Sequence, residues 1–163
     1  MAIRIEPYTE QYRDAVRDLI IPIQVDEFGA EITYEDQPDL TQIGTFYQQG
    51  GGQFWIALDG KEFVGTIALV DIGRQMGALR KMFVRKSHRG AEAGVARQLL
   101  DTLLAHAKTQ GMTEIYLGTI AVFRAAHRFY EKAGFEPVAA EDLPDNFPKM
   151  IPDTHFYKYR FVG

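Results

Sequence analysis

Cysteine is absent from this chain and serine occurs once, and both facts exclude kinds of chemistry. Without cysteine there is no disulfide framework, no thiolate nucleophile and no cysteine-ligated zinc. The single serine, Ser87, lies outside any Gly-x-Ser-x-Gly pattern, so a serine hydrolase is not expected. The histidines show no His-Glu-x-x-His spacing, so we predict no metal site.

Long apolar runs and a positive net charge are missing as well. No run approaches the length that crosses a membrane, and the N-terminus lacks the basic and apolar regions of a signal peptide. We therefore expect a cytoplasmic protein without a membrane partner. A net charge of -4 offers no extended surface for a phosphate backbone, so no nucleic-acid partner is expected.

What is present is a composition suited to one folded unit. The 163 residues are 46% hydrophobic and 12% aromatic, well outside the composition of disordered chains. A chain of this length can bury one core and is short for two. We therefore predict a single domain spanning residues 1–163.

Hydrophobic spacing predicts a mixture of strands and helices. Strands are expected at residues 3–5, 53–58, 61–70, 78–84, 114–118, 135–138 and 155–161. Helices are expected at residues 12–20, 40–47, 92–110 and 122–133, with Pro22 ending the first of them. The Asp59-Gly60 pair predicts a hairpin, and a loop at residues 72–77 extends it into a three-strand antiparallel meander.

The most informative segment joins the last strand of this meander to the long helix that follows. It holds Gly90 and Gly94, and a glycine-bearing turn that opens a helix presents unpaired backbone amides, which bind phosphate. We interpret the basic residues around this turn as the counter-charge of a small polyphosphate, with a solvated strand end as the alternative. They are Arg80, Lys81, Arg85, Lys86 and Arg89.

A second segment carries the pattern Ala-x-x-x-Tyr-x-x-x-Gly-Phe, filled here by Ala126, Tyr130, Gly134 and Phe135. Together with the strand Leu-Arg-Lys-Met-Phe-Val and the glycine-bearing turn, it resembles the GNAT family of N-acetyltransferases, and an uncharacterised bacterial subgroup within it. The resemblance implies an α/β (α+β) fold whose central, mainly antiparallel sheet is splayed where acetyl-CoA enters and is flanked by helices. It also implies direct acetyl transfer from acetyl-CoA to a primary amine (a small amine, an amino acid or a peptide amine) in a ternary complex, and it allows a homodimer.

The family's phosphate signature is Gln or Arg, two residues, Gly, one residue, then Gly or Ala, and it fits this turn in two registers. In the first, Arg89 takes the first position and Gly94 the last, but Glu92 stands where glycine is usual. In the second, which we favour, Gly94-Val95-Ala96 forms the end and Ala91 replaces the cation. Arg89 would then reach the phosphates from a longer turn.

The resemblance also assigns roles around the thioester. The pantetheine arm would lie along residues 81–84, and a main-chain amide near Phe83 or Val84 would polarise the thioester carbonyl. Tyr130 would protonate the departing thiolate, although it also falls on the apolar stripe of its helix, where a core tyrosine is the alternative. Phe123 stands where family members commonly carry a coenzyme-contacting asparagine. The predicted coenzyme contacts are Met82, Phe83, Val84, Arg89, Gly90, Ala91, Gly94, Val95, Ala96 and Phe123.

The sequence indicates the residues that bind the acceptor amine less clearly. Glu27 and Glu31 lie in the segment that borders the acceptor pocket in relatives, and they are the predicted substrate-binding residues. Asp71 and His127 are further candidates for a general base. A solvated side chain is the expected role of each of these four residues, and a chain of waters could replace a dedicated base.

A second function stays open at this point. Glu92 and Phe123, at positions that usually hold other residues, motivate a non-catalytic acyl-CoA-binding module or sensor with the same fold. Both functions imply coenzyme A binding. Only the enzyme predicts thiol release that depends on an added amine and falls in Tyr130→Phe.

Overall fold

The computed structural model describes residues 3–90, 94–119, 124–148 and 153–161, whose strands form one seven-stranded sheet in the order β1-β2-β3-β4-β5-β7-β6. The strands are β1 (Ile3–Pro7), β2 (Gln53–Asp59), β3 (Glu62–Gly73), β4 (Met76–Val84), β5 (Glu114–Thr119), β6 (Glu136–Val138) and β7 (His155–Arg160). The helices are α1 (Arg13–Pro22), α2 (Pro38–Thr41), α3 (Ile43–Phe46), α4 (Val95–Thr109) and α5 (Arg124–Lys132). Shorter helical turns are η1 (Glu10–Tyr12), η2 (Ile23–Glu27), η3 (Lys86–His88) and η4 (Ala140–Asp142).

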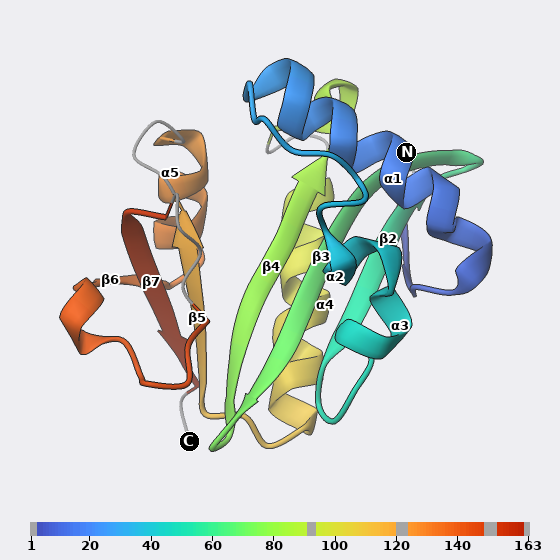
Figure 1. Cartoon of the computed structure of the whole chain (residues 1–163). Coiled ribbons are helices and arrows are strands. Elements are labelled where there is room, and N and C mark those ends of the chain that lie inside the picture. The colour runs from blue at the N-terminus through green and yellow to red at the C-terminus, as the bar shows by residue number, and fades with distance from the viewer. Residues whose placement is uncertain (1–2, 91–93, 120–123, 149–152, 162–163) are drawn as a thin grey trace.

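The sheet is antiparallel except between β4 and β5. These two strands run parallel and pair only where residues 76–78 meet residues 114–116. Beyond that point the two strands diverge, and α5 follows the end of β5 on the far side of the divergence (Figure 1). The predicted mainly antiparallel, splayed sheet flanked by helices is therefore confirmed.

The described residues form two large buried cores, one on each face of the sheet, and a smaller third cluster around Tyr116 of β5. Helices α4 and α5 contribute to the core on one face, where Leu99 of α4 shares a cluster with Ile67 of β3. The N-terminal helices α1 to α3 cover the other face (Figure 1), where Ile20 and Leu40 share a cluster with Phe54 of β2. Each such aliphatic or aromatic side chain contributes about 1.5–3 kcal/mol when fully buried. None of the helices in the described part of the chain is long and apolar enough to span a membrane.

Pro22 ends α1, as the sequence predicts, but the chain does not leave the helical conformation there. Its backbone stays helical at φ -60 and ψ -36, and the chain continues into the π-helical turn η2. There the Phe28 amide donates to the Ile23 carbonyl at 3.1 Å, a bond one residue longer than the α-helical one. Proline lacks an amide and removes one α-helical bond, and the wider turn continues the helix without it.

One predicted helix and one predicted loop also differ from expectation. The helix expected at residues 40–47 is divided into α2 and α3, because Gln42 takes the non-helical angles φ -134 and ψ 56. The loop expected at residues 72–77 shrinks to a tight turn, in which Arg74 and Gln75 adopt φ 56 and φ 63. Two left-handed residues match the twist of a hairpin, but neither residue type signals this conformation in the sequence.

Candidate functional site

Strand β4 changes direction at Lys81, beyond the residues that pair with β5. Lys81 has φ 54, a left-handed conformation that is uncommon for a residue with a side chain. The register passes from Ala68↔Arg80 to Thr66↔Phe83, so β4 carries an extra residue there and forms a bulge. The Thr66 hydroxyl donates to the Lys81 carbonyl at 2.8 Å and holds the bulge in place. The bulge therefore re-aims the end of β4 where the strand has left β5.

A pocket of about 600 Å³ lies between the end of β4, the glycine-bearing turn, the start of α4 and helix α5. Six of the predicted coenzyme contacts line it, namely Met82, Val84, Arg89, Gly90, Gly94 and Ala96. Phe83 instead packs with the core on the opposite face, and Val95 is fully buried beneath the sheet. Ala91 and Phe123 lie outside the described residues. Six of the eight predicted coenzyme contacts that the structure describes therefore surround one pocket, and their role in binding coenzyme A stays a prediction.

The turn ahead of α4 leaves backbone amides available. Gly90 and Gly94 both have left-handed backbones, with φ 105 and φ 69, which glycine adopts without strain. Gly94 is the N-cap of α4, and among the described residues no side chain caps this helix start. The helix thus begins at Val95, and its first amides and positive dipole end are suited to an anion.

Arg89 is held by Glu27, a residue predicted for a different role. The Arg89 guanidinium donates to both carboxylate oxygens of Glu27, at 2.7 Å and 3.0 Å, and its Nε donates to the Val84 carbonyl at 2.8 Å. Hydrogen bonding from Arg89 lowers the pKa of Glu27. This ion pair connects η2 to the glycine-bearing turn, so a phosphate bound at the turn would share Arg89 with Glu27.

Three further cations line the pocket and were not singled out from the sequence. They are Arg97 on the first turn of α4 and Arg128 and Lys132 on α5. Arg128 and Lys132 are four positions apart on one helix, which places them on the same helical face. Their spacing, together with the glycine-bearing turn nearby, could have identified Arg128 and Lys132 from the sequence.

Tyr130 belongs both to the core and to the pocket. It is 6% exposed, shares the α4-side core cluster and lines the pocket together with Met82. Its ring packs against Phe135 with centroids 5.5 Å apart, and no described residue hydrogen-bonds its hydroxyl. Burial raises the pKa of Tyr130 well above its usual value. The phenol therefore keeps its proton at neutral pH, as a proton donor must.

A smaller pocket of about 170 Å³ lies on the other side of β4. Met82 lines both this pocket and the larger one, so both pockets border β4 next to the bulge. The described residues around the smaller pocket come from β4, β5 and the segment between β6 and β7. They are Ala78, Leu79, Arg80, Lys81, Met82, Phe83, Gly118, Phe147, Pro148 and Asp153.

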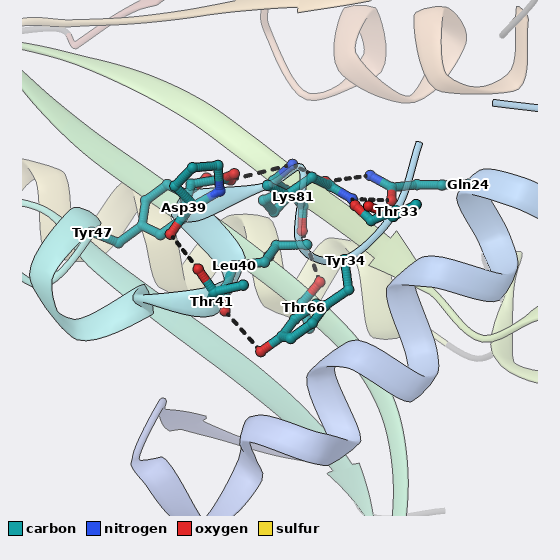
Figure 2. Close-up of polar contacts among 11 residues, drawn as sticks. Gln24, Thr33, Tyr34, Asp39, Leu40, Thr41, Tyr47, Thr66 and Lys81 are labelled. Atoms are coloured by element: carbon teal, nitrogen blue, oxygen red, sulfur yellow. Dashed lines mark hydrogen bonds and ion pairs between the residues drawn. The ribbon is translucent and has the colours of Figure 1, made fainter. Parts of the chain in front are cut away.

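A buried polar network connects the β4 bulge to the N-terminal helices (Figure 2). The Lys81 ammonium lies 3.2 Å from Asp39 Oδ2 and donates to Gln37 Oε1 at 3.2 Å. Tyr47 donates to the same Asp39 oxygen at 2.6 Å, and Gln24 and Gln37 exchange two amide hydrogen bonds. Burial lowers the pKa of Lys81, and the Asp39 charge opposes that shift. The network thus ties the 24–47 segment to the bulge.

Asp153 is a second ionisable residue that the sequence did not single out. It lines the smaller pocket and lies against Gly118 of β5, where a Cβ atom would overlap its carboxylate and approach its Cγ within 2.9 Å. Burial raises the pKa of Asp153, and the charge of Arg80 opposes that shift. Asp153 is therefore a partly buried carboxyl group whose pKa is raised, a kind of group that often occurs at functional sites.

The remaining candidates for a base lie away from both sets of lining residues. Glu31 is exposed. Asp71 accepts backbone hydrogen bonds from Gly51 at 2.8 Å and Gly73 at 3.0 Å, which is a structural role at the end of β3. The ring of His127 packs against His155 of β7, with centroids 5.0 Å apart.

Comparison with known proteins decides the family. The model of the acetyltransferase (GNAT) family matches residues 14–135. The chain belongs to the GNAT family. An acetyltransferase of the GNAT family from Staphylococcus aureus Mu50 is 40% identical, covers 98% of this chain and 99% of that one, and superposes with a TM-score of 0.91.

Two more distant proteins are also similar to this chain. N-acetyltransferase 8F1 of Rattus norvegicus is 32% identical over 115 residues, which is 68% of this chain and 50% of that protein. The chain thus spans about half the length of that curated relative. A PaiA N-acetyltransferase from Thermoplasma acidophilum, solved in complex with coenzyme A, is 13% identical, covers 99% of this chain and 100% of that one, and has a TM-score of 0.76. That last likeness shows the fold alone.

Proposed function

We propose that this GNAT protein, acting as one domain over residues 1–163, transfers an acetyl group from acetyl-CoA directly to a primary amine. The observation that carries the proposal is a pair of pockets that both border the end of β4 and share Met82 in their linings. Two substrates bound on opposite sides of the strand could contact each other there, as direct transfer in a ternary complex requires.

The larger pocket fits coenzyme A in charge and shape. The uncapped start of α4 and the cations Arg97, Arg128 and Lys132 suit a pyrophosphate, which needs amide donors and positive charge. Beyond residue 78, none of the described residues pairs with β4 on the side that faces β5. This free edge of β4 suits an extended pantetheine arm. Acetyl-CoA supplies the activated acetyl group as a thioester.

Different parts of the chain would then have different roles in the acetyl transfer. The bulged end of β4 would orient the thioester carbonyl with a main-chain amide near Phe83 or Val84. Tyr130, protonated at neutral pH because it is buried, would donate its proton to the departing sulfur. The walls around Met82 would exclude water, so that the amine and not water is the nucleophile.

The proposal is tested by release of free coenzyme A from acetyl-CoA in the presence of pooled amines, amino acids and peptides. A thiol reagent reads the release without background, because the chain contains no cysteine. We expect amine-dependent release in the wild type and a loss of about 100-fold or more in kcat for Tyr130→Phe, which keeps the ring and its packing.

The matched control is Tyr159→Phe, because the Tyr159 ring packs against Phe135 from β7 and does not line the larger pocket. This variant should turn over like the wild type. Tight acetyl-CoA binding without release for any amine would support the acyl-CoA-binding module. Unchanged turnover in Tyr130→Phe would remove the acid role.

A further inference from the structure

The hairpin between β2 and β3 lies against the turn η3, and this contact brings together one histidine and two carboxylates. Asp59 ends β2, Glu62 begins β3 and His88 ends η3. One ligand atom from each residue lies within 4.8 Å of those from the other two. We propose that Asp59, Glu62 and His88 bind a zinc ion, with water completing its coordination. None of these three residues lines either pocket, so the site does not depend on the proposed function.

The backbone holds the three ligands in place. Asp59 and Glu62 are cross-strand partners on either side of the tight turn, so their side chains project from the same face of the hairpin. The turn η3 is anchored to this hairpin, because the Arg85 amide donates to the Val64 carbonyl at 2.7 Å and the His88 amide donates to the Arg85 carbonyl at 2.8 Å. Two short connections therefore fix residues that are 29 positions apart in the chain.

The distances between the ligand atoms suit a small tetrahedral ion. His88 Nε2 lies 2.8 Å from Asp59 Oδ2 and 3.9 Å from Glu62 Oε1. Zinc with bonds of about 2.0–2.1 Å holds its ligand atoms about 3.3 Å apart. The two observed distances lie on either side of that separation, so small side-chain rotations are enough to admit the ion. The ion would replace the proton that joins His88 to Asp59.

The imidazole of His88 is oriented from its other nitrogen. Its Nδ1 lies 2.8 Å from the Ser87 hydroxyl oxygen, and its side chain is only 9% exposed. When Nδ1 carries the proton and donates it to Ser87, Nε2 presents its lone pair to the two carboxylates. Metal-binding histidines are commonly held by such a hydrogen bond, which fixes both the tautomer and the ring.

Arg85 orients Glu62 without occupying the proposed site. Its Nε donates to the Phe63 carbonyl at 2.9 Å and lies 3.6 Å from Glu62 Oε2. Arg85 therefore faces one oxygen of Glu62, while the other oxygen, Oε1, is the one that approaches His88. With a neutral His88, the two carboxylates and Arg85 leave one net negative charge, which favours a cation.

The ligand set favours zinc among the common divalent cations. Magnesium and calcium take oxygen ligands, and a buried imidazole offers them none. Zinc accepts imidazole nitrogen together with carboxylate oxygen, usually at four-coordinate sites. Glu62 is 50% exposed, so the ion can enter from solvent and water can take the fourth position. The prediction from sequence of no metal site considered only local spacing, which does not show these three residues together.

Zinc at this cluster would connect the β2–β3 hairpin to η3, the turn that directly precedes Arg89 of the larger pocket. Because the ligands come together only in the folded chain, the ion binds the folded state and stabilises it. Zinc at about 100 times its dissociation constant should raise the melting temperature by about 5–10 °C.

The test titrates the full chain, without an affinity tag and stripped with EDTA, with zinc chloride against a chromogenic chelator. Thiols contribute no binding, because the chain contains no cysteine. We expect the wild type to bind a single zinc ion. His88→Gln and Asp59→Asn should each raise the dissociation constant at least about tenfold, since even residues that only orient a metal ligand contribute about 10–100-fold. Both variants should also lose the zinc-dependent rise in melting temperature.

Matched controls separate this site from other zinc binding. His155→Gln and Glu10→Gln replace exposed residues of the same types outside the cluster and should bind zinc like the wild type. Melting curves without zinc check that each variant folds. Because His88 is buried, X-ray absorption of the wild-type zinc complex adds a test without any variant. It should show one imidazole together with oxygen ligands at about 2.0–2.2 Å.

Three results would overturn the proposal. Equal zinc affinity in His88→Gln and the wild type would place the ion elsewhere, as would a spectrum with two imidazoles or none. If zinc does not bind at all, His88 and Asp59 form a structural hydrogen bond only. Failure of this site is distinguishable from failure of the proposed function, because coenzyme A release is measured on the EDTA-stripped chain.

Discussion

Replacement of Asp39 by asparagine should destabilise the protein strongly, because it leaves the Lys81 ammonium group buried without an opposite charge. The two side chains are 10% and 11% exposed, and their charged atoms are 3.2 Å apart. Removal of one partner from such a pair costs about 3–5 kcal/mol. Gln37 still accepts a hydrogen bond from the ammonium group at 3.2 Å, so we expect the lower end, about 3 kcal/mol.

Urea unfolding and thermal melting at pH 7 measure this loss. For a protein of this length, about 3 kcal/mol corresponds to a melting temperature lower by about 6–12 °C. Asp14→Asn is the matched control, because the Asp14 side chain is 73% exposed and its removal should cost little. The double variant Asp39→Asn with Lys81→Met should recover part of the loss, because it removes the buried charge as well.

The pH dependence gives the prediction a second readout. Burial already lowers the pKa of Lys81, and removal of Asp39 lowers it further. Between this lowered pKa and the ordinary lysine pKa of about 10.4, the unfolded chain binds more protons than the folded one, so stability rises with pH. The loss in Asp39→Asn should therefore be smaller at pH 10 than at pH 7. A loss below about 1 kcal/mol at pH 7, or a double variant as unstable as the sum of the singles, would refute the reasoning.

Three further predictions concern the larger pocket. Because burial raises the pKa of Tyr130, kcat measured with saturating substrates should not fall through loss of the phenol proton below about pH 10. In Glu27→Gln, Arg89 should lose its ion pair and become available to the phosphates, which should lower the dissociation constant of coenzyme A by up to about fivefold. Calorimetry should measure a smaller change in 0.5 M salt. Arg128→Gln should raise that constant about tenfold and leave the KM of acetyl-pantetheine, which lacks the nucleotide phosphates, unchanged. An equal loss for acetyl-pantetheine would show that Arg128 does not contact phosphate.

Local patterns were enough to predict most of the elements. The apolar stripe of α4, the Asp59-Gly60 hairpin and the alternating strands all appear in the structure near their predicted bounds. These features depend on side-chain spacing and turn chemistry within a few residues, which the sequence displays directly. The end of α1 at Pro22 was predicted, but the π-helical turn after it has no such local signal. The 72–77 loop was wrong because two left-handed residues of ordinary type have no local signal either.

The candidate site could be predicted only in part. The glycine turn and Tyr130 were identified because the resemblance attaches a role to each of these motifs. The bulge at Lys81 has no motif, because it depends on pairing with Thr66 across the sheet. Asp153 and Arg80 could not be connected either, since they come from segments that the sequence separates widely and the fold brings to one pocket.

The sequence by itself determined most of the elements, the mainly antiparallel sheet and the glycine-bearing turn before α4, since periodicity, glycine placement and the two family motifs are local properties of the chain. The tertiary structure decided which charged and polar side chains contact each other. Arg89 pairs with Glu27, 62 positions away, and Lys81 binds Gln37, 44 positions away. Such pairs depend on where β4 and β5 diverge and on which side of β4 each segment packs, and a one-dimensional pattern does not contain that information.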